Sequence, residues 1–234
     1  MLFKLFGMSG SRPQVLEQAV TDFLSMIDHC HWMYGRAGEA LWGQADVATA
    51  RTEIYQRDIK VNQAERAVRK AIVTHLSMNP RQDMNLCLIL MSVVKDAERV
   101  GDYCKNMMDL PTYHALQGDA NAVTTELRRI QDQVQGLFPT VLAAFREEDE
   151  ESGAALVRQE REVTRACEAV IAQVLDAPSL SNRQAVAYTL LARFHKRVAA
   201  HLGNIASSLV MPIHKLDYFD EEYLPGQGPP PDGE

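Results

Sequence analysis

Apolar residues recur at helical spacing along most of the chain, and this pattern is interrupted where proline, glycine and asparagine occur together. Val15, Ala19, Phe23, Met26 and Ile27, for example, follow the three- and four-residue steps that place side chains on one face of a helix. No segment shows a clear alternation of apolar and polar residues, which would be typical of a half-buried strand. We therefore predict an all-α fold.

The interruptions divide the chain into six long helices. Pro13 suits a helix start because its missing N–H would have no intrahelical partner, whereas Asn79-Pro80 and Pro212 end helices. The predicted helices are 14–41, 47–78, 84–110, 121–146, 153–175 and 183–209, with the acidic run 146–151 as a solvated turn. Three long helices in each half predict two tandem antiparallel three-helix bundles.

The predicted domain organisation follows from these breaks. Residues 1–12 form a flexible N-terminus, 13–112 the first three-helix repeat, and 113–212 the second. Residues 213–234 form a C-terminal tail whose later part is rich in proline and glycine, a composition that cannot bury enough apolar surface to fold and predicts disorder.

Composition excludes several classes of function. The net charge of −7 argues against a nucleic-acid protein, because neutralising phosphates needs a basic surface. The four cysteines lack metal-finger spacing and are expected to be buried, reduced thiols, which predicts a cytoplasmic protein. The sequence contains no run of 18 or more apolar residues, so we predict no membrane-spanning helix.

One segment, 95–106, concentrates the polar residues of interest. Glu98, Asp102 and Asn106 recur every four residues and therefore share one face of a helix. Like charges at this spacing repel, so a cation is expected to offset them. Asp58 and Glu65, seven residues apart in the preceding helix, also share a face. Hard metal cations prefer such oxygen ligands.

The spacing alone leaves a second interpretation open. The acidic face can instead form a salt-bridged helix interface. Its basic partners would then be Lys60, Arg69, Lys95 and Arg99.

The two halves also share sequence fragments. Arg99-Val100 and Asn106 recur 98 residues later as Arg197-Val198 and Asn204, which indicates a tandem duplication. The copies differ chemically, since Lys196 and Ala200 replace Glu98 and Asp102. We expect a buried Lys196 ammonium where the first half would place a cation.

These motifs resemble a known family. The run Lys95-Asp-Ala-Glu-Arg-Val-Gly-Asp102, followed by Lys105-Asn-Met107, resembles the signature helix of the PhoU family. The preceding helix, with Asp58-Ile-Lys-Val-Asn-Gln-Ala-Glu65, is also similar to that family.

The resemblance implies a cytoplasmic regulator of phosphate uptake and phosphate signalling that acts with a phosphate transporter or a sensor histidine kinase. It also implies a site for iron, zinc, manganese or magnesium in the first repeat, with the second site lost. The expected ligands are Glu98, Asp102, Asp58 and Glu65, with support from Asn62, Asn106, Lys95 and Arg99. A homodimer is possible, and membrane association is expected only through a partner.

Catalysis is not expected. The sequence has no Glu-x-x-His, HExxH, phosphate-binding glycine loop or nucleophile elbow. The alternatives to a metal-supported regulator are a helical scaffold without metal and, less favoured, a metal-dependent enzyme.

Overall fold

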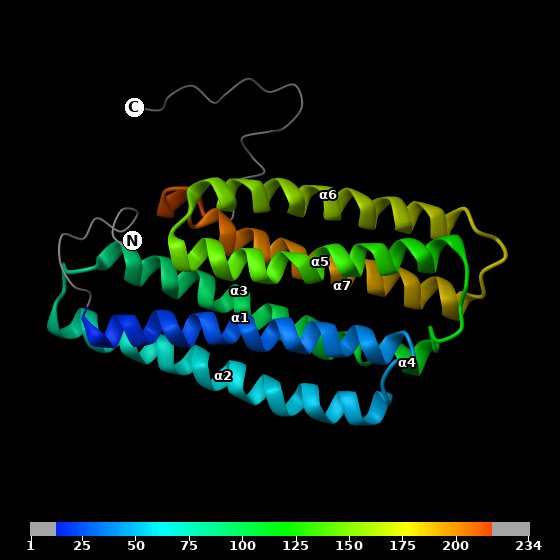
Figure 1. Cartoon of the computed structure of the whole chain (residues 1–234), viewed down its shortest axis with the longest axis horizontal. Coiled ribbons are helices and arrows are strands. Elements are labelled where there is room, and N and C mark those ends of the chain that lie inside the picture. Colours follow the sequence, from blue (N-terminus) through cyan, green and yellow to red (C-terminus); the bar gives the residue numbers. More distant parts are fainter. Residues whose placement is uncertain (1–12, 217–234) are drawn as a thin grey trace, which may run out of the picture.

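All the regular structure described by the computed structural model is helical (Figure 1). The described residues are 13–216. The elements are α1 (Gln14–Leu41), α2 (Val47–Met78), α3 (Met84–Met107), the short α4 (Leu110–Tyr113), α5 (Ala122–Glu147), α6 (Glu150–Leu175), α7 (Asn182–Ser207) and the 3-10 turn η1 (Ile213–Lys215). The all-α prediction with six long helices is therefore confirmed. The predictions for 1–12 and for 217–234 lie outside the described residues.

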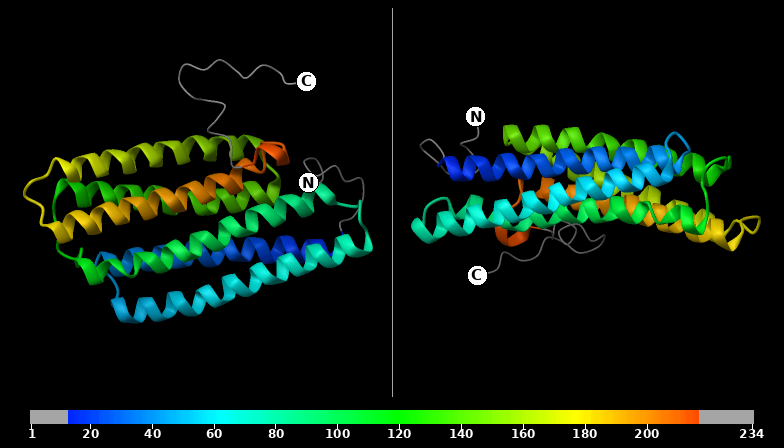
Figure 2. Two further views of the ribbon diagram at one scale, coloured as in Figure 1. Left: turned by 180° about the vertical axis from the view of Figure 1, so that it is seen from behind. Right: turned by 90° about the horizontal axis from the view of Figure 1, so that it is seen from below.

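The six long helices form two antiparallel groups of three. Within each repeat the helices pack on one another: α1, α2 and α3 in the first, and α5, α6 and α7 in the second. The repeats meet where α3 packs on α7 and α1 packs on α5. Helices α2 and α6 lie at opposite edges of the molecule, as both side-on views show (Figures 1 and 2). The inner helices therefore carry the contacts between repeats.

Side-chain caps fix several helix starts. Asp46 accepts a hydrogen bond from the Thr49 backbone N–H at 2.8 Å, which satisfies one of the free donors at the start of α2. Asn121 and Ser181 cap α5 and α7, each with a reciprocal bond from the residue three positions later. These polar residues set the register in which each apolar face meets its neighbours.

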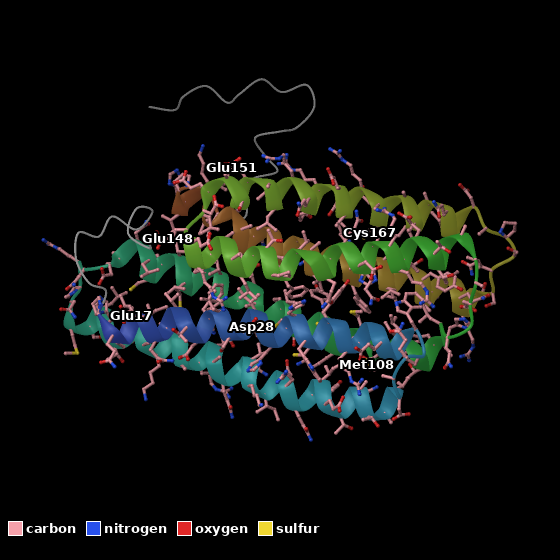
Figure 3. All side chains as sticks on the ribbon, in the orientation of Figure 1. Glu17, Asp28, Met108, Glu148, Glu151 and Cys167 are labelled. Atoms are coloured by element: carbon pink, nitrogen blue, oxygen red, sulfur yellow. The ribbon has the colours of Figure 1, made fainter. Side chains whose placement is uncertain are left out.

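The acidic run 146–151 differs from the predicted solvated turn. Helix α5 continues through Glu147, and Asp149 caps α6 by accepting from the N–H groups of Glu151 and Ser152 at 3.0 and 3.2 Å. Glu148 is buried and adopts a left-handed conformation between the helices, and Figure 3 shows it near Glu151 at this junction. Carboxylates are favoured at helix N-termini because of the helix dipole, so the run starts a helix.

The C-terminal end of α3 is also shorter than predicted. It ends at Met107, and Leu110 begins the separate helix α4 with a proline in its first turn. Proline is tolerated there because a first-turn residue needs no intrahelical hydrogen bond from its nitrogen.

A buried polar contact joins the two repeats within the apolar core. His195 of α7 is fully buried, and its Nδ1 pairs with the hydroxyl of Tyr34 from α1. Its Nε2 is buried without a hydrogen-bond partner among the described residues. Burial lowers the pKa of His195 from 6.5 to about 3. The folded protein therefore holds this imidazole neutral.

This buried histidine predicts loss of stability in mild acid. Below pH 6.5 the unfolded chain protonates this group and the folded chain does not, so the free energy of unfolding falls by up to about 1.4 kcal/mol per pH unit from this site alone, until pH approaches the folded pKa. We expect His195→Gln to remove that part of the slope in urea unfolding. Replacing the exposed His214 with glutamine should leave it unchanged. Equal slopes in wild type and His195→Gln would contradict the assignment.

Candidate functional site

The predicted acidic residues meet at the contact between α2 and α3. We call Asp58 and Glu65 of α2, with Glu98 and Asp102 of α3, the acidic cluster. Gly101 lets the two helices approach here, because a Cβ at this position would lie 3.3 Å from Asp58 Oδ1. The residues that helical spacing places on one face of each helix therefore lie at one interface.

A lysine that the sequence analysis did not select lies between two members of this cluster, Asp58 and Asp102. Lys105 Nζ donates to Asp58 Oδ2 at 2.8 Å and lies 2.9 Å from Asp102 Oδ1. Burial lowers the pKa of Lys105, but the hydrogen bonds to Asp58 and Asp102 outweigh burial and leave its pKa raised. The ammonium is therefore held charged between two carboxylates. The sequence indicated this contact by the position of Lys105 three residues after Asp102, because residues at this spacing are neighbours on a helix.

The predicted supporting residues divide into three groups. Asn62 donates to Asp58 Oδ2 at 3.0 Å, so it belongs to the cluster. Asn106 is exposed and makes no side-chain hydrogen bond with the described residues. Lys95 and Arg99 line a pocket on the side of α3 that faces α7, and Arg99 also reaches back to the cluster.

Arginines hold the remaining carboxylates. Arg99 lies 3.3 Å from Asp102 and 3.8 Å from Glu98, and Arg69 lies 2.8 Å from Glu65. Burial raises the pKa of Glu98, and the negative charges of Asp102 and Glu65 raise it further. Each member of the acidic cluster therefore has a lysine or arginine partner, and Glu98 still experiences excess negative charge.

The fit to a metal ion can be judged from these contacts. Carboxylate oxygens from adjoining helices are suitable donors for a hard cation, and Asp58 Oδ1 is buried without a hydrogen-bond partner in the part of the chain that the structure describes. However, no three or more His, Cys, Asp or Glu side chains between residues 13 and 216 are grouped so that they could hold a metal. As placed, these oxygens form an ion-pair network with lysine and arginine side chains.

The second repeat has a related but differently filled contact. Glu160 of α6 is buried and accepts from Thr164 Oγ1 at 2.7 Å, as Asp58 accepts from Asn62. Its Cγ would lie 2.9 Å from a Cβ on Gly203, the residue that aligns with Lys105. Lys196 instead pairs with the exposed Glu168 at 2.6 Å. The prediction of a buried cation at Lys196 is therefore wrong, because the Lys196 side chain is itself 26% exposed and its partner Glu168 is 59% exposed.

This architecture defines a class: an all-α protein made of two tandem three-helix repeats, each with an acid of its second helix packed against its third. The model of the PhoU domain matches residues 23–110 and 127–209, so the chain belongs to the PhoU domain family. The resemblance inferred from the sequence is thereby confirmed.

Solved structures show the same fold. The crystal structure of PhoU from Pseudomonas aeruginosa is 23% identical, with a TM-score of 0.74, and the match covers 83% of this chain and 95% of that one. The phosphate transport system regulatory protein PhoU from Streptococcus pneumoniae is 17% identical at the same TM-score, covering 83% of this chain and 92% of that one. The comparison with curated proteins finds no match.

The buried ion pair makes a sharp prediction about stability. Lys105→Met should lower the free energy of unfolding by about 2 kcal/mol, because it leaves the Asp58 charge buried without its ammonium. Adding Asp58→Asn should recover most of that loss, as chemical denaturation can measure.

A lysine with an exposed acidic partner supplies the matched control. The Lys105 and Lys196 side chains are 21% and 26% exposed, so the two pairs differ mainly in the burial of their acids. Lys196→Met removes a pair whose acid, Glu168, is 59% exposed, and should cost less than about 1 kcal/mol. Equal losses in Lys105→Met and Lys196→Met would show that the acidic cluster does not depend on Lys105.

Proposed function

We propose that this chain is a cytoplasmic PhoU-like regulator of phosphate uptake and phosphate signalling, which acts by binding a phosphate transporter or a sensor histidine kinase. The match of the PhoU domain model to both repeats carries this proposal. The similar Streptococcus pneumoniae protein, described as a phosphate transport system regulatory protein, supports it. The proposed role is regulation by protein contact, without catalysis, by a monomer or a homodimer.

The outer helix α2 offers a surface suited to such contacts. Tyr55, Ile59 and Val73 fall on one side of the helix and are 42%, 55% and 58% exposed. This helix lies at the edge of the molecule (Figure 1). Exposed apolar residues aligned on one helix face are typical of protein–protein interfaces. We call these three residues the α2 stripe.

The proposed contact with a phosphate transporter does not require this chain to insert a helix into the membrane. Between residues 13 and 216, no helix combines the length and the apolar character that crossing a bilayer requires. We propose that membrane association occurs only through the transporter.

The α2 stripe gives a test of regulation. In a bacterial strain that lacks its own PhoU protein, expression of this chain should restore repression of a phosphate-starvation reporter when phosphate is abundant. Ile59→Glu/Val73→Glu should abolish that repression without loss of folded protein, because two charges would enter the proposed interface. Leu175→Glu, at an exposed residue of α6, is the control and should retain repression. Failure of the wild-type chain to repress would overturn the proposal.

Metal support remains a separate proposal. A divalent or ferric ion, either iron, zinc, manganese or magnesium, would use Glu98 and Asp102, with Asp58 and Glu65 as companions. The raised pKa of Glu98 supports it, because a cation would relieve the excess negative charge there. The second candidate is a metal-free helical scaffold, favoured by the ion pairs that every carboxylate of the acidic cluster already makes.

Elemental analysis distinguishes these two candidates. Protein purified without chelators or a polyhistidine tag should contain metal if the first holds, and Glu98→Ala/Asp102→Ala should lose it because both carboxylates are removed. Glu168→Ala, an acid outside the acidic cluster, should retain the wild-type content. Equal, near-zero metal in all three proteins would remove metal from the proposed function and leave the scaffold.

A further inference from the structure

A polar pocket lies between the two repeats, on the side of α3 away from the acidic cluster. Its volume is about 600 Å³, and its walls include Lys95, Arg99 and Tyr103 of α3 with Arg197, His201 and Asn204 of α7. Pockets of this size are common among small-ligand sites. Both repeats contribute to it, so it exists only where α3 and α7 pack together.

Two cations of this pocket have no acidic partner among residues 13–216. Lys95 is exposed and makes neither a hydrogen bond nor an ion pair there. Arg197 uses its Nε to donate to the Tyr103 hydroxyl at 3.1 Å, and its guanidinium lies over the Tyr103 ring. That contact orients the arginine and leaves its terminal nitrogens without a protein acceptor.

The third cation is only partly neutralised. Arg99 shares its charge with Asp102 at 3.3 Å and Glu98 at 3.8 Å, and about half of its side chain is exposed. Three cations around one pocket repel one another, and surface cations usually avoid this by spreading into solvent. Their grouping across two repeats therefore has an electrostatic cost that an anion would offset.

One carboxylate, Asp96, also lies on the pocket wall, so the three cations outnumber a single acid there. Asp96 Oδ1 accepts from His201 Nδ1 at 2.8 Å and from Asn204 Nδ2 at 2.9 Å. All three residues lie at the α3–α7 contact, and His201 also stacks on Tyr103. His201 is 8% exposed, and its Nε2 is buried without a hydrogen-bond partner among the described residues. This network holds the wall in place and leaves a buried ring nitrogen unpaired.

We propose that the pocket between α3 and α7 binds a phosphate-type oxyanion, either inorganic phosphate or the phosphoryl group of a small phosphate ester. Guanidinium groups match tetrahedral oxyanions because their N–H donors form a planar fork, and Lys95 adds a mobile positive charge. The volume leaves room for more than a single phosphate, so both sources are tested. The proposal goes beyond the regulatory role and rests on neither a metal nor a transporter.

The ligand would contact both repeats at once. Lys95 and Arg99 come from the first repeat and Arg197 comes from the second. A ligand that binds only when α3 and α7 are packed together stabilises that packing by mass action. Binding should therefore also raise the thermal midpoint of the full chain.

Calorimetric titration of the full chain with inorganic phosphate, and separately with ATP, tests the site. At constant ionic strength, we expect saturable binding of one anion per chain. Arg197→Gln and Lys95→Gln should each weaken it by about tenfold or more, because each removes a charged donor. Arg193→Gln is the matched control, since Arg193 is an exposed arginine one turn earlier on α7 that does not line the pocket.

The outcomes separate the sources and can overturn the proposal. Tighter binding of phosphate than of ATP identifies the free anion, and the reverse order with competition identifies an ester; both support the site. Lys95→Gln removes no protein contact, so it tests the pocket even if Arg197→Gln fails to fold. No saturable binding of either anion, or equal affinity in Lys95→Gln and wild type, would overturn it.

Discussion

Burial of α3 on three sides is the constraint on which the other features depend. It packs against α1 and α2 within its repeat and against α7 of the other repeat. Its first half, from Leu86 to Val94, is largely apolar around the helix, and several of these residues are buried. A helix that is apolar all round must be covered on several sides. The second repeat supplies the cover that a lone three-helix bundle would lack.

The polar half of α3 presents different sets of charged residues on its two flanks. Towards α2 it presents Glu98 and Asp102, and towards α7 it presents Lys95 and Tyr103. Arg99 borders both flanks, because it pairs with the acidic cluster and also lines the pocket. Electrostatic changes on one flank therefore reach the other through a single side chain. This arrangement follows from helical geometry, since residues three and four apart share a face.

The sequence predicted those features of the structure that depend on residues close together in the chain, and it missed those that depend on residues far apart. Periodicity and the breaks at proline predicted the six helices, because those signals are local, and the four-residue spacing predicted that Glu98 and Asp102 share a face. The role of Lys105 required knowing that Asp58 sits across from it, 47 residues away. The pocket required knowing that Arg197 meets Tyr103, 94 residues away. Such pairings depend on which helices pack together, and periodicity does not reveal that.

The second repeat shows how the same helix contact can be kept after its charges change. Glu160 aligns with Asp58 but has one more methylene, and Gly203 stands where the first repeat has Lys105. The longer acid packs over the glycine, so its apolar stem occupies the space in which a side chain at position 203 would begin. With no equivalent of Glu98 or Asp102 on α7, Arg197 has no neighbouring acid there to pair with. Absence of the acidic motif from the second repeat thus accounts for a guanidinium in the pocket that has no acidic partner among residues 13–216.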